Sequence, residues 1–121
     1  MSKIKLGVIE SIFADIIWEN APLTTRQLVN LCEEKLEWKR TTTYTVLKKL
    51  CERGIFSMEN RMVDVLISKE EFHAIKSEEF VKENFQSSLP AFIAAFTTRQ
   101  KLTNEELDEI RNMMDSMAEN M

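Results

Sequence analysis

The chain has 121 residues, of which 44% are hydrophobic and 30% charged, and its formal net charge is −4. That length allows one domain, or a small domain with a dimerising appendage, and the presence of only two glycines and two prolines favours a mainly helical fold. Because no stretch approaches the roughly 18 apolar residues of a membrane span and the N-terminus lacks a signal-peptide core, we expect a cytoplasmic protein.

Three helices are predicted in the first half of the chain. Apolar residues recur every three or four positions over residues 8–18, which is typical of an amphipathic helix. Thr24 and Gln27 have the spacing of a capping box and are expected to begin a second helix. A third helix is expected over residues 40–53, with Gly54 at the left-handed position that commonly follows a helix.

A β-hairpin is predicted directly after the third helix. The short runs IFSM and MVDVLI have β-like composition, and they flank Glu59-Asn60-Arg61, in which Asn60 tolerates a positive φ. Three short helices followed by a hairpin describe a winged helix-turn-helix. In that fold the third helix lies in the major groove and the hairpin, or wing, touches the adjacent DNA backbone.

Three further helices are expected after the hairpin. Ser68, with a glutamate three residues later, is expected to begin a helix that ends near Phe85. Pro90 suits the first turn of the next helix, and Thr103 is expected to begin the last one with a second capping box. The predicted fold is therefore mainly α with a small β-hairpin wing, followed by a C-terminal helical region.

The two predicted domains differ in charge. Residues 1–68, the winged-helix DNA-binding domain, contain ten Lys/Arg and nine Asp/Glu, whereas residues 69–121, the helical dimerisation region, contain six and eleven. The segment 38–53 contains five basic residues and one acidic residue, a local charge of +4. A basic patch in an otherwise acidic protein is compatible with binding to DNA phosphates.

The third predicted helix contains four threonines and a tyrosine, although β-branched residues lower helix propensity. On a helical wheel, one side is apolar, formed by Thr43, Val46, Leu47 and Leu50. Threonine offers a hydroxyl and a methyl group to base edges, and Lys or Arg binds phosphates, so the opposite side is predicted to contact DNA. The predicted DNA-contacting residues are Lys39, Arg40, Thr41, Thr42, Tyr44, Thr45, Lys48, Lys49 and, in the wing, Arg61. In the alternative interpretation, the threonines merely begin a solvated helix.

The chain resembles the penicillinase-repressor family, the BlaI/MecI-type regulators, over nearly its whole length. The resemblance rests on an ordered set of segments: IIW at 16–18, TTRQLVNLC at 24–32, W at 38 with TTTYTVLKKL at 41–50, RG at 53–54, SLPAFIAAF at 88–96 and KLTNEELDEI at 101–110. It implies a homodimeric repressor of a palindromic operator that controls β-lactam resistance or a related stress response. It also implies that positions 42, 45 and 49 lie at the DNA.

The same resemblance implies how the protein dimerises and how it is released from its operator. The dimerisation residues would be apolar side chains of the C-terminal helices, namely Phe80, Phe85, Phe92, Ile93, Phe96, Leu107, Ile110, Met113, Met114 and Met117. A membrane-bound sensor protease would relieve repression by cutting between Ala95 and Phe96. The chain departs from the family where Lys39-Arg40 replace Ser-Pro, where Ala95 replaces the asparagine before the cut, and where Asp64 makes the wing acidic. It also lacks the C-terminal cysteine cluster of the copper-responsive relatives.

Other classes of function have little support in the sequence. No glycine-rich phosphate loop, nucleophile elbow or metal quartet is present, so we expect neither an enzyme nor a cofactor. The only histidine, His73, is expected at the surface, and Cys32 and Cys51 are expected to be buried free thiols because they lack C-x-x-C spacing. Two alternatives stay open: a winged-helix protein-interaction module that does not bind DNA, and a DNA-binding repressor released by a small-molecule effector.

Overall fold

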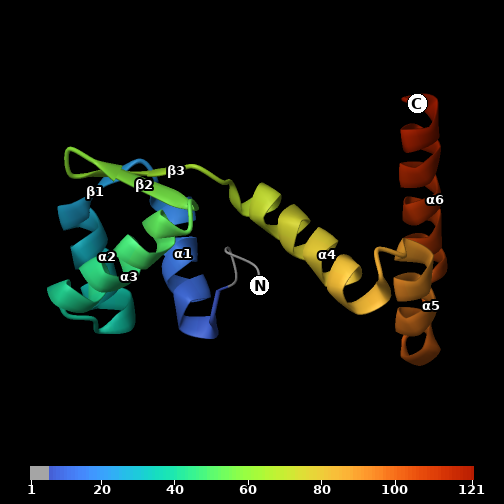
Figure 1. Ribbon diagram of the computed structural model, residues 1–121, viewed down its shortest axis with the longest axis horizontal. Helices are drawn as coiled ribbons and strands as arrows, with labels where there is room; N and C mark the ends of the chain where they lie inside the picture. Colours follow the sequence, from blue (N-terminus) through green and yellow to red (C-terminus); the bar gives the residue numbers. More distant parts are fainter. Residues whose placement is uncertain (1–5) are drawn as a thin grey trace. The chain divides into compact units, whose positions relative to one another are not determined.

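The computed structural model describes residues 6–121, and the chain divides into two compact units, with the boundary between Glu79 and Phe80. The first unit contains α1 (Val8–Asn20), β1 (Leu23–Thr24), α2 (Thr25–Leu36), α3 (Arg40–Glu52), β2 (Phe56–Glu59) and β3 (Met62–Val65) (Figure 1). The helix α4 (Lys69–Phe85) begins in the first unit, and its last turns belong to the second, together with α5 (Leu89–Arg99) and α6 (Asn104–Glu119). The prediction of a winged helix-turn-helix followed by a helical region is confirmed.

Side-chain caps explain where several helices begin. At the start of α2, the Thr24 hydroxyl accepts a hydrogen bond from the Gln27 N–H at 3.1 Å, and the Gln27 side chain accepts one from the Thr24 N–H at 2.8 Å. Thr103 and Glu106 form the same reciprocal capping box for α6. These bonds satisfy N–H groups that have no partner within the first helical turn, so the predicted starts of both helices are confirmed.

The wing is a two-residue hairpin extended by a short third strand. β2 and β3 pair from Phe56↔Val65 to Glu59↔Met62, and both turn residues, Asn60 and Arg61, have positive φ angles of 51° and 63°. Such angles match the twist of the hairpin strands. The sheet order is β1-β3-β2. The strand β1 was missing from the prediction, because two residues show no alternation that could reveal a strand.

The core of the first unit lies between the three helices and the inner face of the sheet. Phe13 of α1 is fully buried, and its ring stacks on Trp38, directly before α3, with 5.5 Å between ring centroids. Trp18 packs against Phe72 in the first turns of α4, at 5.4 Å, and donates its indole N–H to the carbonyl of Ile67 at 3.0 Å. The beginning of α4 is therefore part of the winged-helix core.

Both cysteines are free thiols, but they are buried to different degrees. Cys32 is fully buried in the core, whereas Cys51 is only half-buried. Burial raises the pKa of both thiols. The prediction of buried free thiols is thus confirmed for Cys32 and holds only in part for Cys51.

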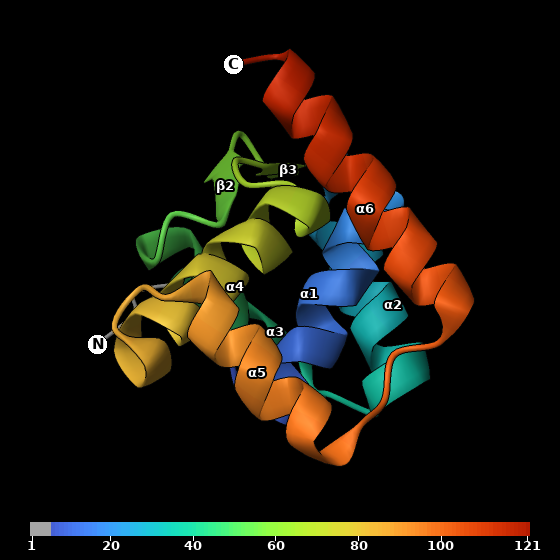
Figure 2. The ribbon, with the colours of Figure 1, turned by 90° about the vertical axis from the view of Figure 1, so that its right-hand side faces the viewer.

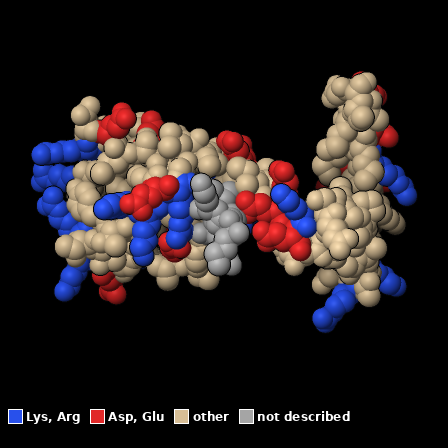
Figure 3. Space-filling view, in the orientation of Figure 1, with Lys and Arg blue, Asp and Glu red and all other residues tan. Residues whose placement is uncertain are grey.

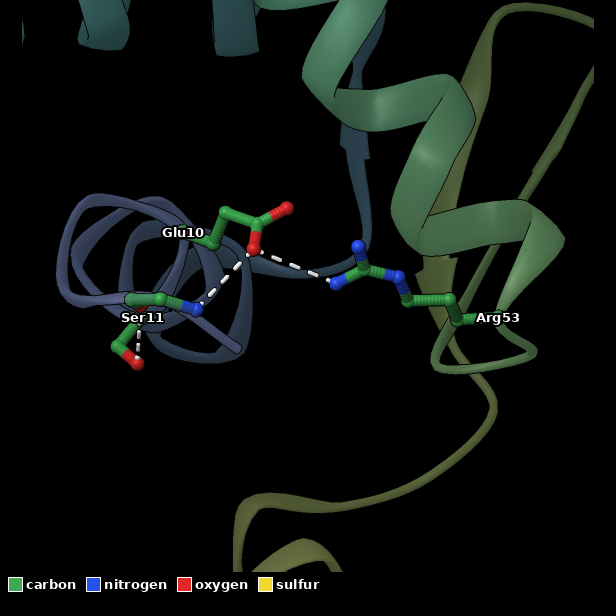
Figure 4. Close-up of polar contacts among 4 residues, drawn as sticks. Glu10, Ser11 and Arg53 are labelled. Carbon is green, nitrogen blue, oxygen red and sulfur yellow. Dashed lines mark hydrogen bonds and ion pairs between the residues drawn. The ribbon is translucent and has the colours of Figure 1, made fainter. Parts of the chain in front are cut away.

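One ion pair joins the start of α1 to the end of α3 (Figure 4). The Glu10 carboxylate accepts a hydrogen bond from the Gly7 N–H at 3.1 Å and lies 3.3 Å from a guanidinium nitrogen of Arg53. The Gly7 N–H and the neighbouring Arg53 lower the pKa of Glu10 below its ordinary value of 4.5. Both side chains are partly shielded from water, being 25% and 32% exposed.

Replacing Glu10 by glutamine is expected to lower the free energy of unfolding at pH 7 by about 1 kcal/mol, because glutamine can still accept from Gly7 but cannot pair with the Arg53 charge. A carboxyl with a lowered pKa stabilises the fold fully above its ordinary pKa, and this contribution disappears as the pH falls through the lowered value. Urea unfolding at several pH values measures both effects. The wild type and the E10Q variant should converge in acid, and E19Q, at an exposed position of α1, should match the wild type throughout.

Candidate nucleic-acid interface

The helix α3 has one buried and one exposed side. Thr43, Leu47 and Leu50 are at most 1% exposed, and Val46 is half-buried. The exposed residues of the helix include Thr41, Thr42, Thr45, Lys48 and Lys49. The predicted division of the helix into an inner and an outer side is therefore confirmed, and the outer side is free of the unit's own core.

Two threonines of α3 bond back to their own helix. The Thr45 hydroxyl donates to the carbonyl of Thr41 at 2.9 Å, and the buried Thr43 hydroxyl donates to the carbonyl of Lys39 at 3.4 Å. Such bonds give a hydroxyl a partner four residues earlier and are a known way for threonine to be accommodated within a helix. The threonine-rich sequence therefore forms a regular helix despite its low propensity.

Basic side chains surround this exposed face. Lys39 precedes the first residue of α3, Arg40 begins it, and Lys48 and Lys49 follow on its exposed side. Figure 3 shows Lys and Arg gathered at the left-hand edge of the first unit, where Figure 1 places α2, α3 and the turn between β2 and β3. Arg53 differs from the others, because it pairs with Glu10. The basic residues at and near the start of the helix are thus available to an anionic partner.

Tyr44 of α3 interacts with Arg40 of the same helix and with the start of α2. The Arg40 guanidinium sits over its ring, 5.5 Å from the ring centroid. A hydrogen bond from the Thr25 side chain is the main cause that lowers the pKa of Tyr44, and Arg40 and Arg61 lower it further through their positive charges. The structure therefore brings together three residues predicted to contact DNA, Arg40, Tyr44 and Arg61. Thr25 was missed, since its neighbour Thr24 fulfils the capping role that the sequence reveals.

Arg61 occupies the tip of the wing in a left-handed conformation, which residues other than Gly, Asn and Asp adopt at a cost of about 1–2 kcal/mol. Its carbonyl accepts a hydrogen bond from the N–H of Thr25 at 2.9 Å, which ties the wing tip to the first residue of α2. Glu59 and Asp64 are also exposed on the wing. Arg61 is the only basic residue in the segment 55–68.

The second unit contains a cluster of phenylalanine rings. Successive ring centroids lie 5.5–6.2 Å apart from Phe80 through Phe85 and Phe92 to Phe96. Phe80 and Phe96 are nevertheless about half exposed. Ile93, which follows Phe92 in the sequence, is half-buried. The predicted cleavage position lies within α5, where Ala95 and Phe96 are both exposed.

The helix α6 has an apolar stripe that is largely exposed to solvent in a single chain. Leu107 and Ile110 are half-buried, while Met113, Met114 and Met117 are 54%, 51% and 64% exposed. Neither α5 nor α6 contains a single buried residue, and Figure 2 shows the two helices running in opposite directions and set apart from each other. The predicted dimerisation residues of α5 and α6 thus lie on helices that bury little apolar surface within one chain.

Metal and membrane sites find no support among the described residues. His73 is exposed, as expected, and its ring contacts the edge of Phe72 at 5.6 Å. Within residues 6–121, no group of three or more His, Cys, Asp or Glu side chains could hold a metal ion. No helix in this part of the chain has the length and apolar character needed to cross a membrane.

Comparison with known proteins agrees with this arrangement. The chain matches the family described as "Penicillinase repressor" over residues 6–116. It is 20% identical to the penicillinase repressor of Bacillus licheniformis over 104 residues, which cover 83% of this chain and 81% of that protein. It is also 18% identical to the methicillin resistance regulatory protein MecI of Staphylococcus aureus over 107 residues, covering 85% and 87% of the two chains. The chain therefore belongs to the penicillinase repressor family of DNA-binding transcriptional regulators.

Proposed function

We propose that the protein is a homodimeric repressor that binds a palindromic operator through α3 and is released by cleavage in its C-terminal region. The observation that carries this proposal is the exposed face of α3, where Thr41, Thr42 and Thr45 are followed by Lys48 and Lys49 on the side turned away from the core. Threonine hydroxyls and methyl groups suit base edges, and the lysines suit phosphates. The genes under its control would be those of β-lactam resistance or a related stress response, as the names of the relatives suggest.

Dimerisation is supported by the second unit. Its phenylalanine cluster and the methionines of α6 leave much apolar surface in contact with water in a single chain. Groups of large apolar side chains that are exposed in a single chain are typical of interaction sites. A second copy would cover these residues, and it would also supply the second α3 that a palindromic operator requires.

Release by a membrane-bound sensor protease is supported by the position of Ala95 and Phe96. Both residues are exposed, and in the sequence they come after the winged-helix unit and before α6. A cut between them would separate the DNA-binding half of the chain from the methionine stripe of α6. The two binding units would then no longer be linked, and operator affinity would fall because the second half-site is no longer bound at high effective concentration.

The DNA-binding role is tested by replacing Thr42 and Thr45 by valine, which retains the shape and removes the hydroxyls. For each lost base contact we expect operator affinity to fall by about 1–3 kcal/mol, or roughly 5- to 150-fold, while affinity for unrelated DNA changes little. Fluorescence anisotropy at two salt concentrations, with an operator selected from random duplexes by the wild-type protein, gives both affinities.

The matched control is T98V in α5, because Thr98 is also exposed and also bonds back to the carbonyl four residues earlier, at 3.0 Å. This variant should bind the operator as the wild type does. A wild-type protein that selects no preferred duplex, or a T42V/T45V variant with unchanged preference, would contradict readout by α3. The second outcome is what a protein-interaction module would produce.

A further inference from the structure

The start of α2 is joined both to α3 and to the wing by one residue, Thr25. This threonine is only 5% exposed. Its backbone N–H donates to the carbonyl of Arg61 at 2.9 Å, and hydrogen bonding by its side chain is the main cause that lowers the pKa of the Tyr44 hydroxyl. The N–H is one of those that a helix leaves without an internal partner at its first turn, so the wing tip completes the hydrogen bonding of α2.

Two guanidinium groups, those of Arg40 and Arg61, act on the Tyr44 hydroxyl. The Arg40 guanidinium lies over the Tyr44 ring, 5.5 Å from its centroid, and the charges of Arg40 and Arg61 both lower the pKa of the Tyr44 hydroxyl. Arg40 belongs to α3 and Arg61 to the wing, so the two cations come from the two elements that a winged helix applies to DNA. Without the Thr25 hydroxyl, Tyr44 would keep its ring contact with Arg40 and lose the interaction that lowers its pKa most.

We propose that Thr25 is a positioning residue of the DNA interface, which holds Tyr44 of α3 and Arg61 of the wing in a single array. This inference rests on the proposed DNA-binding function. Thr25 itself is buried and does not need to touch DNA. Its role is to keep the cations of the two elements at a constant separation before binding, so that less ordering of long side chains is required when a duplex is bound.

The bond to Tyr44 can be tested without DNA, because the chain has a single tyrosine. Protein labelled with carbon-13 at the tyrosine Cζ gives one signal, whose chemical shift reports ionisation of Tyr44. The T25V variant retains the backbone N–H and the buried shape and removes only the hydroxyl. Because the Thr25 hydroxyl lowers the pKa of Tyr44, that pKa should be higher in T25V than in the wild type.

The positioning role is then measured with the selected operator. T25V should weaken binding by about 3- to 10-fold, the range expected for one net hydrogen bond. T25P also removes the N–H that holds Arg61. Proline is tolerated here because Thr25 is the first residue of α2 and because the extended backbone of Thr24 suits a following proline. This variant should bind at least as weakly as T25V, and the slope of log affinity against log salt should decrease by about 1 if the Arg61 phosphate contact is lost.

The control for both measurements is T43V, which removes a different buried hydroxyl from the residue directly before Tyr44 in α3. It should leave the Tyr44 signal and operator affinity close to those of the wild type. Circular dichroism confirms that each variant is folded. An unchanged Tyr44 pKa in T25V overturns the proposal, and so does a raised pKa with unchanged operator affinity. A wild-type protein without an operator would instead refute the proposed function, while the tyrosine titration would still report the Thr25 bond.

Discussion

Replacing Met113 and Met117 of α6 by glutamate is expected to convert the protein into a monomer and to weaken operator binding by about 10²- to 10⁴-fold. The two side chains are 54% and 64% exposed in a single chain, so the unit does not depend on them for its own packing. In a dimer, however, the new carboxylates would be buried without partners, which strongly opposes association. Each monomer would then bind one half-site, and its affinity would not be increased by a linked partner at the other half-site.

Sedimentation equilibrium measures the monomer fraction, and fluorescence anisotropy with the selected operator measures affinity. The matched control is N112E/S116E, which adds the same two charges to exposed polar positions of α6 outside the apolar stripe. This control should remain dimeric and bind normally. A monomeric M113E/M117E variant with the affinity of the wild type would show that the C-terminal helices do not link the two half-sites.

Replacing Phe13 by alanine is expected to lower the free energy of unfolding by about 3–5 kcal/mol. Phe13 is fully buried and its ring stacks on Trp38, so the substitution removes apolar contacts and leaves a cavity beneath the chain segment that leads into α3. A loss of this size is a large part of the stability of a small domain. Operator binding should weaken as well, because Trp38 would no longer hold the start of α3 in place.

Urea unfolding followed by tryptophan fluorescence gives the change in stability, since the chain has two tryptophans and both lie in the first unit. The control is I12A on the same helix. Ile12 is 43% exposed, and its substitution should cost about 1 kcal/mol or less. If F13A were no less stable than I12A, Phe13 would not be central to the core of the winged helix.

Much of the fold could be predicted because the signals are local. The spacing of apolar residues predicted α1, and the pairs Thr24–Gln27 and Thr103–Glu106 located the starts of α2 and α6 to the residue. The separation of α3 into an apolar and a polar side followed from the same periodicity. The hairpin followed from its change of period and from Asn60, although the positive φ of Arg61 was not foreseen.

The features that could not be predicted depend on residues far apart in the sequence. The bond of Thr25 to Arg61 and the pair of Arg53 with Glu10 each join segments more than thirty residues apart, and no local pattern marks either of them. As a result, Arg53 was counted with the basic patch, although it pairs with α1. The strand β1 was missed for the same reason, because only its pairing with β3 defines it.

The back-bond of Thr45 has a consequence for the operator itself. Its hydroxyl proton is committed to the carbonyl of Thr41, so only the lone pairs of the oxygen face outward. In the proposed complex, a base that meets this oxygen must supply the proton, and in the major groove only the amino groups of adenine and cytosine do so. Each half-site should accordingly present adenine or cytosine opposite Thr45, with guanine or thymine disfavoured on that strand.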